Sequence, residues 1–263
     1  MLELDHVSAR YDGKSTKEAL NDVNLTLKNE KAVVVGPNGS GKTTLLKVIL
    51  GLVHNESGKV SVMGHELSRV QGEIRVSTNL AEVYRIIGGT VRDTIAVYSI
   101  LKGADESEVL NTISDFGLDS ILRKKIYQLS SGEQKMLGNI LALSFSPSLI
   151  LLDEPFDNVD QGRRVKLLRK VEECGSEILM NTHELDILPR LENWALYFII
   201  EGRIFGRFSA SQVKRLFINR GEVPGSLASI DTSFGKFSIT QDEGMIPIAT
   251  ARNLNSIFDE VSQ

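Results

Sequence analysis

The sequence predicts an α/β fold, in which a mostly parallel β-sheet is covered by helices. The order of the predicted elements along the chain is the basis of this prediction. Short apolar runs typical of buried strands, such as KAVVV (31–35) and LILLD (149–153), alternate along the chain with helical patterns. This alternation is typical of parallel sheets with both faces covered. A mostly helical stretch from about residue 79 to 147 interrupts the alternation, which predicts a helical insertion.

The N-terminal part of the chain has a strand pattern. LELDHVSARY (2–11) and LNDVNLTL (20–27) contain short β-rich runs, and SGKVSVMGHEL (57–67) returns to short strands after the first predicted helix. We expect these runs to form an antiparallel β subdomain beside the parallel sheet.

Composition narrows the classes of partner and compartment. The 263 residues are 41% hydrophobic and 24% charged, and the net charge of −4 lacks the basic excess typical of proteins that bind nucleic acid, so none is expected as a partner. The single cysteine, Cys174, excludes an internal disulfide and suggests a reducing compartment. The longest apolar runs fall short of the ~20 residues that cross a bilayer. We expect a cytoplasmic protein.

The strongest motif is GPNGSGKTT, residues 36–44, between a strand and a helix. Its glycines let backbone N–H groups point into one cavity at a helix start, where the phosphates of a nucleotide bind. Lys42 would reach the β- and γ-phosphates, and Thr43 would ligate Mg²⁺. The alternative is a glycine-rich turn that only connects strand to helix. The predicted nucleotide-binding set is Gly36, Pro37, Asn38, Gly39, Ser40, Gly41, Lys42, Thr43 and Thr44.

Two carboxylates follow the apolar strand LILLD. Asp153 and Glu154 would lie at the carboxyl edge of the sheet, where open α/β sheets bind ligands. Asp153 is suited to hold Mg²⁺, and Glu154 to orient or deprotonate a water that attacks the γ-phosphate. A solvated turn is the alternative. His183 ends another strand-like run and could reach the same phosphate, although a structural histidine is also common there.

The stretch LSSGEQK (129–135) has two interpretations. Ser130 and Glu133 fit a capping box, in which both side chains satisfy free amides at a helix start. The same amides, with Ser131 and Gly132 beside them, could bind a γ-phosphate. Because the chain already has a phosphate loop, that nucleotide would belong to a second copy.

In this order, the motifs resemble the ATP-binding subunit of ABC transporters over roughly residues 1–215. GPNGSGKTT is similar to the family's Walker A motif, LSSGEQ to its signature, LILLDEP to its Walker B motif, NVD to its D-loop, and His183 to its switch histidine. The resemblance implies a P-loop NTPase core with a helical signature subdomain. It also implies two subunits packed head to tail around two ATP molecules, Ser130 to Glu133 grasping the partner's nucleotide.

Three further residues follow from the resemblance. Tyr11 is placed where the family stacks an aromatic ring on adenine, with a packed sheet tyrosine as the alternative. Asp160 would line the dimer interface, or simply start a helix. The family's glutamine at the entry to the helical insertion is absent, and Asn79 is the best candidate to replace it as a Mg²⁺ ligand.

The resemblance implies Mg²⁺-dependent ATP hydrolysis that drives an integral membrane subunit, with the chain peripheral on the inner face of the membrane. The cofactors would be ATP and Mg²⁺, and the partners a second ATPase subunit, as a homodimer or close paralogue, and the membrane subunit. A soluble assembly ATPase without a membrane partner stays open. We expect residues 1–218 to form the ATPase module, with its helical subdomain at about 79–147.

Residues 219–263 are expected to form a small α+β appendage. Strand-like stretches surround a turn at 242–244, and NLNSIFDEV (253–261) has apolar residues at helical spacing. Packing on the core and a regulatory or dimer-stabilising role are both open.

Overall fold

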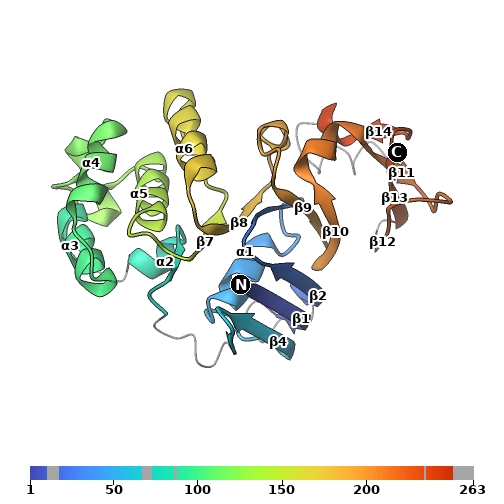
Figure 1. Ribbon diagram of the computed structural model, residues 1–263, viewed down its shortest axis with the longest axis horizontal. Coiled ribbons are helices and arrows are strands. Elements are labelled where there is room, and N and C mark those ends of the chain that lie inside the picture. The colour runs from blue at the N-terminus through green and yellow to red at the C-terminus, as the bar shows by residue number, and fades with distance from the viewer. Residues whose placement is uncertain (11–17, 67–72, 86–87, 234, 251–263) are drawn as a thin grey trace. The chain divides into compact units, whose positions relative to one another are not determined.

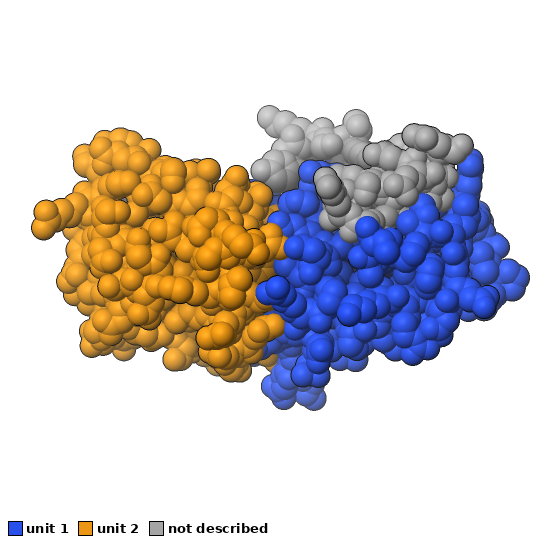
Figure 2. All heavy atoms as spheres, turned by 90° about the horizontal axis from the view of Figure 1, so that it is seen from above, with its two compact units in different colours: residues 1–71, 181–263 blue, residues 72–180 orange. Residues whose placement is uncertain are grey.

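We describe the protein from a computed structural model, which covers residues 1–10, 18–66, 73–85, 88–233 and 235–250. The chain divides into two compact units, and Figure 2 colours them separately. Unit 1 holds residues 1–71 and 181–263, and unit 2 holds residues 72–180. The division falls within strand β8 (Glu177–Thr182), all six residues of which are buried.

Unit 1 begins with an antiparallel sheet, as the alternation predicts (Figure 1). Its strand order is β2-β1-β4-β5, from β1 (Leu2–Ala9), β2 (Leu20–Leu27), β4 (Ser57–Val62) and β5 (His65–Glu66). Leu2 pairs with Leu27 and Leu4 with Leu25, and all four side chains are buried. The apolar alternation therefore sets the register, because a one-residue slip would expose this face.

The phosphate loop of unit 1 follows β3 (Lys31–Val35), which pairs in parallel with β9 (Ala195–Ile200). β10 (Arg203–Ser209) continues antiparallel to β9. Helix α1 (Lys42–Ile49) follows the loop and ends at its C-cap, Leu50. Gly51 comes next with φ +70°, the left-handed conformation in which glycine commonly stops a helix.

The C-terminal part of unit 1 is a four-stranded antiparallel sheet of order β12-β13-β11-β14. The strands are β11 (Leu216–Arg220), β12 (Ala228–Thr232), β13 (Gly235–Gln241) and β14 (Ile246–Pro247). Short 3₁₀ helices η4 (Leu188–Arg190), η5 (Ala210–Arg215) and η6 (Ile248–Thr250) complete the unit. The sheet begins at Leu216, so the predicted appendage boundary at 218/219 falls inside β11. The predicted helical pattern at 253–261 lies outside the described residues.

Unit 2 contains the helical insertion and the strands that flank it. The parallel pair β6 (Val76–Thr78) and β7 (Leu149–Asp153) places Thr78 opposite Leu151. The helices are α2 (Ala81–Tyr84), α3 (Val91–Lys102), α4 (Ser107–Asp115), α5 (Ser131–Leu143) and α6 (Gln161–Glu173), with 3₁₀ turns η2 (Asp119–Ile121) and η3 (Ile126–Gln128). Residues 136 to 143 of α5 are all buried, so α5 is the core helix of this unit.

The pairs β3–β9 and β6–β7 are both parallel, which confirms the expected mostly parallel sheet, and the N-terminal strands confirm the antiparallel subdomain. Within the described part of the chain, every helix is too short or too polar to cross a lipid bilayer.

Candidate nucleotide-binding and catalytic site

The phosphate loop is shaped by glycines that leave no room for a side chain. A Cβ on Gly36 would lie 2.3 Å from the carbonyl oxygen of Ile199 and 2.6 Å from the hydroxyl of Ser40. A Cβ on Gly41, the N-cap of α1 with φ +105°, would lie 2.3 Å from the carbonyl oxygen of Ala19. Real Cβ atoms do not approach other atoms this closely, so the loop conformation requires glycine at both positions.

Polar groups of the loop are available to a phosphate. The buried Lys42 ammonium donates to the carbonyl oxygens of Gly36 (2.8 Å) and Pro37 (3.0 Å), which holds it within the loop. The Ser40 hydroxyl is buried and has no hydrogen-bond partner within the described residues. Buried polar groups normally have partners, and a phosphate oxygen could supply one here. The residues present therefore fit a nucleoside triphosphate.

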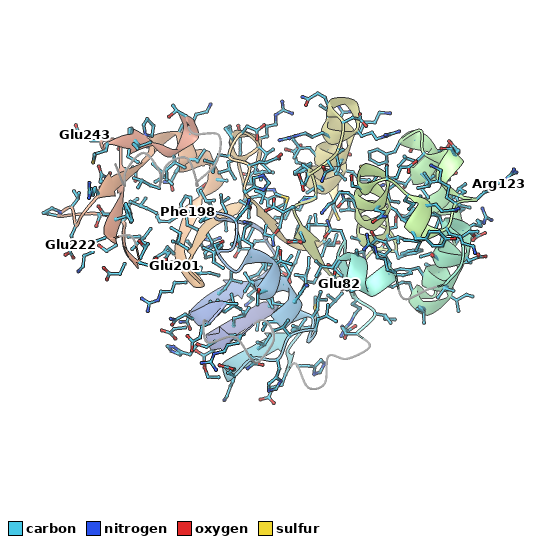
Figure 3. All side chains as sticks on the ribbon, turned by 180° about the vertical axis from the view of Figure 1, so that it is seen from behind. Glu82, Arg123, Phe198, Glu201, Glu222 and Glu243 are labelled. Carbon is cyan, nitrogen blue, oxygen red and sulfur yellow. The ribbon has the colours of Figure 1, made fainter. Side chains whose placement is uncertain are left out.

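The turn between β9 and β10 is hydrogen-bonded to the phosphate loop. The Gly202 N–H donates to the Ser40 carbonyl (2.9 Å), and the Gly202 carbonyl accepts from the Asn21 N–H (2.9 Å). The neighbouring Glu201, labelled in Figure 3, accepts the Ser233 N–H at 2.9 Å. The C-terminal sheet thus contacts the turn that supports the phosphate loop.

In unit 2, the predicted carboxylates lie at the end of β7. Asp153 is the last residue of the strand, and Glu154 follows it with φ +44°; both are half-buried. The left-handed region is disfavoured for residues other than glycine, and such strain is common at functional sites.

Asn79, the predicted replacement for the family's glutamine, directly follows β6 and is buried. Its Oδ1 accepts the Asp153 N–H (2.7 Å), and its Nδ2 donates to the Asp153 carbonyl (3.1 Å) and to Oδ1 of Asn139 (2.8 Å). The Asn79 side-chain amide is thus hydrogen-bonded to other groups of the protein. Its role as a metal ligand stays a prediction that no observation here tests.

The capping box predicted in LSSGEQK is present. Ser130 is the N-cap of α5, its Oγ accepts the Glu133 N–H (3.2 Å), and its own N–H donates to Oε2 of Glu133 (2.8 Å). Lys124 donates to the other carboxylate oxygen at 2.7 Å, and this bond, followed by the Ser130 N–H, lowers the pKa of Glu133. Ser131 and Gly132 form the first turn, and a Cβ on Gly132 would lie 2.6 Å from the carbonyl oxygen of Asn158.

Asp160 also starts a helix, as the second interpretation of that residue predicts. It is the N-cap of α6, and its Oδ1 accepts the Arg163 N–H at 3.0 Å. That bond is the main cause of a lowered pKa of Asp160. The side chain is 57% exposed, so it is also accessible to a second copy of the chain.

The other residues predicted to contact the nucleotide or Mg²⁺ lie next to β8 and in α1, except for Tyr11. His183 follows β8 directly and is half-buried, while Thr43 and the buried Thr44 lie in the first turn of α1. Tyr11 lies outside the described residues.

Sequence reasoning did not find Asn139 or Lys135, both on α5. The buried Asn139 donates to the Pro155 carbonyl (2.7 Å), and Lys135 donates to the Asp153 carbonyl (3.0 Å). The signal was an asparagine inside the apolar run MLGNILAL, because a buried amide needs a partner.

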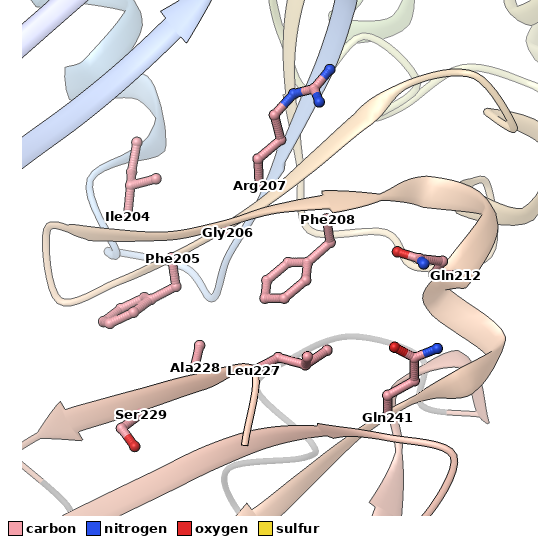
Figure 4. A pocket seen from close by; sticks show the side chains of 10 residues that line it. All are labelled: Ile204, Phe205, Gly206, Arg207, Phe208, Gln212, Leu227, Ala228, Ser229 and Gln241. Carbon is pink, nitrogen blue, oxygen red and sulfur yellow. The ribbon is translucent and has the colours of Figure 1, made fainter. Parts of the chain in front are cut away.

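Away from the phosphate loop, a cavity of about 510 Å³ lies between β10 and the C-terminal sheet. Figure 4 shows the rings of Phe205 and Phe208 pointing from β10 toward Leu227 and Ala228. The charged group of its lining, Arg207, pairs with Glu30. This lining is unsuited to a triphosphate.

A family profile described as ABC transporter matches residues 20–157. The chain belongs to the ABC transporter family. It is an ATP-binding subunit, and the comparison confirms both the resemblance and the fold predicted from the motifs. The taurine import ATP-binding protein TauB of Escherichia coli (strain K12) is 34% identical over 199 residues, which cover 71% of this chain and 74% of that protein.

Solved structures extend the comparison to nearly the whole chain. A crystal structure described as a cobalt transport ATP-binding protein (cbiO-2) is 37% identical, with a TM-score of 0.89, and covers 98% of this chain and 99% of its own. A dimer of the ATP-binding cassette MJ0796 with ADP and Pi is 23% identical, with a TM-score of 0.68, and covers 80% of this chain and 99% of its own. At that identity the second likeness shows the fold alone.

Proposed function

We propose that this ABC subunit hydrolyses ATP with Mg²⁺, as a homodimer in which each nucleotide lies between the phosphate loop of one copy and the signature residues of the other. The observation that carries the proposal is the glycine-shaped loop of unit 1, which holds the buried Lys42 and the Ser40 hydroxyl. A carboxylate pair directly after a buried strand of unit 2 supports it.

Each residue has a defined role in this proposal. Lys42 moves from its carbonyl acceptors to the β- and γ-phosphates, where its charge is better compensated. Thr43 and Asp153 would hold Mg²⁺, which neutralises phosphate charge when bound. Glu154 accepts a proton from the attacking water, and His183 orients that water against the γ-phosphate.

The start of α5 would complete the partner's site. The backbone N–H groups of Ser130 and Glu133 are already bonded to each other's side chains. In this proposal, the first turn of the helix at Ser131 and Gly132 is therefore the part that faces the phosphate. Asp160 lies on the same dimer surface, and Tyr11 would stack on adenine.

Glu154→Gln tests the catalytic role. This variant should bind ATP, lower kcat by roughly 10²–10⁴-fold because general base catalysis is lost, and accumulate as an ATP-bound dimer on size-exclusion chromatography. A turnover rate equal to that of the wild type would refute the role of Glu154.

Mixing two inactive variants tests the shared site. Lys42→Ala lacks the phosphate-loop charge, and Ser130→Arg places bulk at the start of α5, so each homodimer should be inactive. In a mixed dimer, one of the two sites combines Lys42 from one copy with Ser130 from the other, and turnover should reappear. Circular dichroism checks that Ser130→Arg still folds. A monomer that hydrolyses ATP at the full rate would contradict the proposal.

We also propose that the subunit drives import through a separate membrane chain, on the inner face of the membrane. Two relatives are described as transport ATP-binding proteins, one for taurine import and one for cobalt. Because those cargoes differ, neither is assigned to this chain. Unit 2 exposes apolar side chains on α3, Ile100 at 79% and Leu101 at 61%, which suit a protein contact.

Leu101→Glu tests the membrane contact. The variant should lose co-purification with a multi-span membrane protein, while nucleotide binding by the isolated subunit stays unchanged. Val165→Glu, at an exposed apolar residue on α6, is the matched control. Equal loss of co-purification in both variants would contradict a contact through α3, and recovery of no membrane protein with the wild type would favour the soluble assembly ATPase.

A further inference from the structure

Two buried asparagines join the loop after β7 to the rest of unit 2. Asn79 is 4% exposed and Asn139 is fully buried. The Asn79 Nδ2 donates to Asn139 Oδ1 at 2.8 Å. Buried amides are costly unless they are hydrogen-bonded, so an apolar helix such as α5 retains one only where it makes specific contacts.

Asn79 pairs with the backbone of Asp153 as a strand would. β6 ends at Thr78, opposite Leu151, and the Asn79 N–H donates to the Leu151 carbonyl at 3.4 Å. Beyond that point the Asn79 side chain replaces the strand, because its amide accepts the Asp153 N–H (2.7 Å) and donates to the Asp153 carbonyl (3.1 Å). The parallel ladder is thus extended by one residue through a side chain.

Asn139 holds the other side of the same turn. Its Nδ2 donates to the Pro155 carbonyl at 2.7 Å, while its Oδ1 accepts from Asn79. Both hydrogens of the Asn79 amide have acceptors. The orientation of each amide is therefore determined by its partners, since a flipped Asn79 would place its NH₂ against the Asp153 N–H.

Glu154 is the residue between these two anchors. It has φ +44°, a conformation that is disfavoured for a residue with a side chain and persists where its surroundings hold it. The backbone of Asp153 on one side and of Pro155 on the other is fixed by the linked amides. The two asparagines, together with Lys135, which also donates to the Asp153 carbonyl (3.0 Å), thus hold the backbone from which the Glu154 carboxylate extends.

We infer that Asn79 and Asn139 are positioning residues that hold Glu154 in its catalytic orientation, and that Asn79 does so in place of ligating Mg²⁺. The inference rests on the role proposed for Glu154. It differs from the metal role expected for Asn79, because this pair of linked asparagines, the amide clamp, acts through the protein backbone.

The experiment compares Asn79→Ala, Asn79→Gln and Asn139→Ala with the wild type. A displaced Glu154 should lower kcat by roughly 10–100-fold, since small misplacements of reacting groups are costly. The Kd for ATP should change less than about twofold, because the phosphate loop is untouched. Half-saturation by Mg²⁺ should stay unchanged. The Asn79→Ala/Asn139→Ala double variant should lose no more activity than the worse single variant, because both act through one turn.

A second readout needs neither metal nor nucleotide. The Asp153 amide donates to Asn79, so its hydrogen exchange in the free subunit should accelerate in both Asn79→Ala and Asn79→Gln, and in Asn139→Ala through the lost link. Ser144→Ala is the matched control, since it removes a buried hydrogen bond to Ile140 (2.7 Å) on the same helix. It should lower stability and leave kcat and Asp153 exchange unchanged.

Three results would overturn the inference. The first is wild-type kcat in a folded Asn139→Ala. The second is an Asn79→Gln variant with full activity beside an Asn79→Ala variant that needs more Mg²⁺, the result that a metal ligand gives. The third is an equal kcat loss in Ser144→Ala. If Glu154→Gln keeps wild-type turnover, the proposed catalytic role fails; if Glu154→Gln is inactive while the asparagine variants are not, the clamp alone fails.

Discussion

The phosphate loop of unit 1 and the carboxylate turn of unit 2 are held in place by different means. Around Gly36 and Gly41 the loop is shaped by close backbone contacts with Ile199 and Ala19, and by the hydrogen bond from Gly202 to Ser40. The turn at Glu154 is held by the side-chain amides of Asn79 and Asn139. The loop has no room for an added atom at Gly36 and Gly41, whereas the turn depends on specific polar side chains. The two regions should therefore fail under different substitutions.

Among the substitutions that test this difference, Gly36→Ala should have the largest effect on stability and ATP binding. Its φ is ordinary, so the damage comes from the new Cβ, 2.3 Å from the Ile199 carbonyl oxygen. We expect a loss of about 2–3 kcal/mol in the free energy of unfolding, as for other overpacked sites, and loss of ATP binding. Chemical denaturation and nucleotide titration measure both.

Gly39→Ala is the matched control for the close contact. Gly39 has φ +78° but open space around its Cβ position, so only backbone strain of about 1–2 kcal/mol is expected. Equal losses in the two variants would show that conformational freedom, and not close packing against β9, shapes the loop.

The sequence predicts the first region better than the second for the same reason. A loop built from glycines, a lysine and threonines needs those residue types at fixed spacing, so GPNGSGKTT could be interpreted from the sequence alone. The Walker B strand was equally clear, because four apolar residues precede Asp153. In the signature, the sequence supported both a capping box and a phosphate contact, and the structure shows the box.

The amide clamp could not be predicted in the same way. Asn79 and Asn139 are 60 residues apart and meet only because α5 packs near the end of β6, a tertiary contact that no local pattern encodes. The place of Asn79 in the chain matches the family's glutamine and therefore predicts a metal ligand, whereas its backbone partners depend on the register of β6 against β7. The C-terminal sheet was also only partly predicted, since Leu216 and Phe217 continue the preceding turn without a break in the pattern.

Ser130→Ala tests a smaller contribution to stability, that of the cap at the start of α5. Losing the Ser130 hydroxyl leaves the Glu133 N–H at the start of α5 without its cap, which costs about 1 kcal/mol. Thermal or chemical unfolding measures this loss. Ser131→Ala is the control, because Ser131 follows the cap and makes no capping bond. A similar loss in both variants would mean that the cap has no special role in the stability of unit 2.

A dependence of stability on pH should appear at the start of α5, where a charged side chain takes part in the cap, and it is the smallest effect we expect. The Lys124 and Ser130 contacts lower the pKa of Glu133 from its ordinary 4.5, so the folded state favours the charged form. The resulting stability is fully present above pH 4.5 and is lost as pH falls through the lower pKa of the folded state. Because the pair is partly exposed, its contribution is about 0.5 kcal/mol.

Glu133→Gln isolates that contribution, since glutamine can still accept the Ser130 N–H in a capping box but carries no charge. The free energy of unfolding of the wild type should exceed that of the variant at pH 7, and the difference should shrink as the pH falls below 4.5 through the lowered pKa of Glu133. Gly39→Ala, which acts through backbone strain, should show a difference from the wild type that stays constant over the same range. A constant difference for Glu133→Gln would mean that the ion pair with Lys124 adds nothing to the cap, and that the hydrogen bonds of the capping box hold the start of α5 without it.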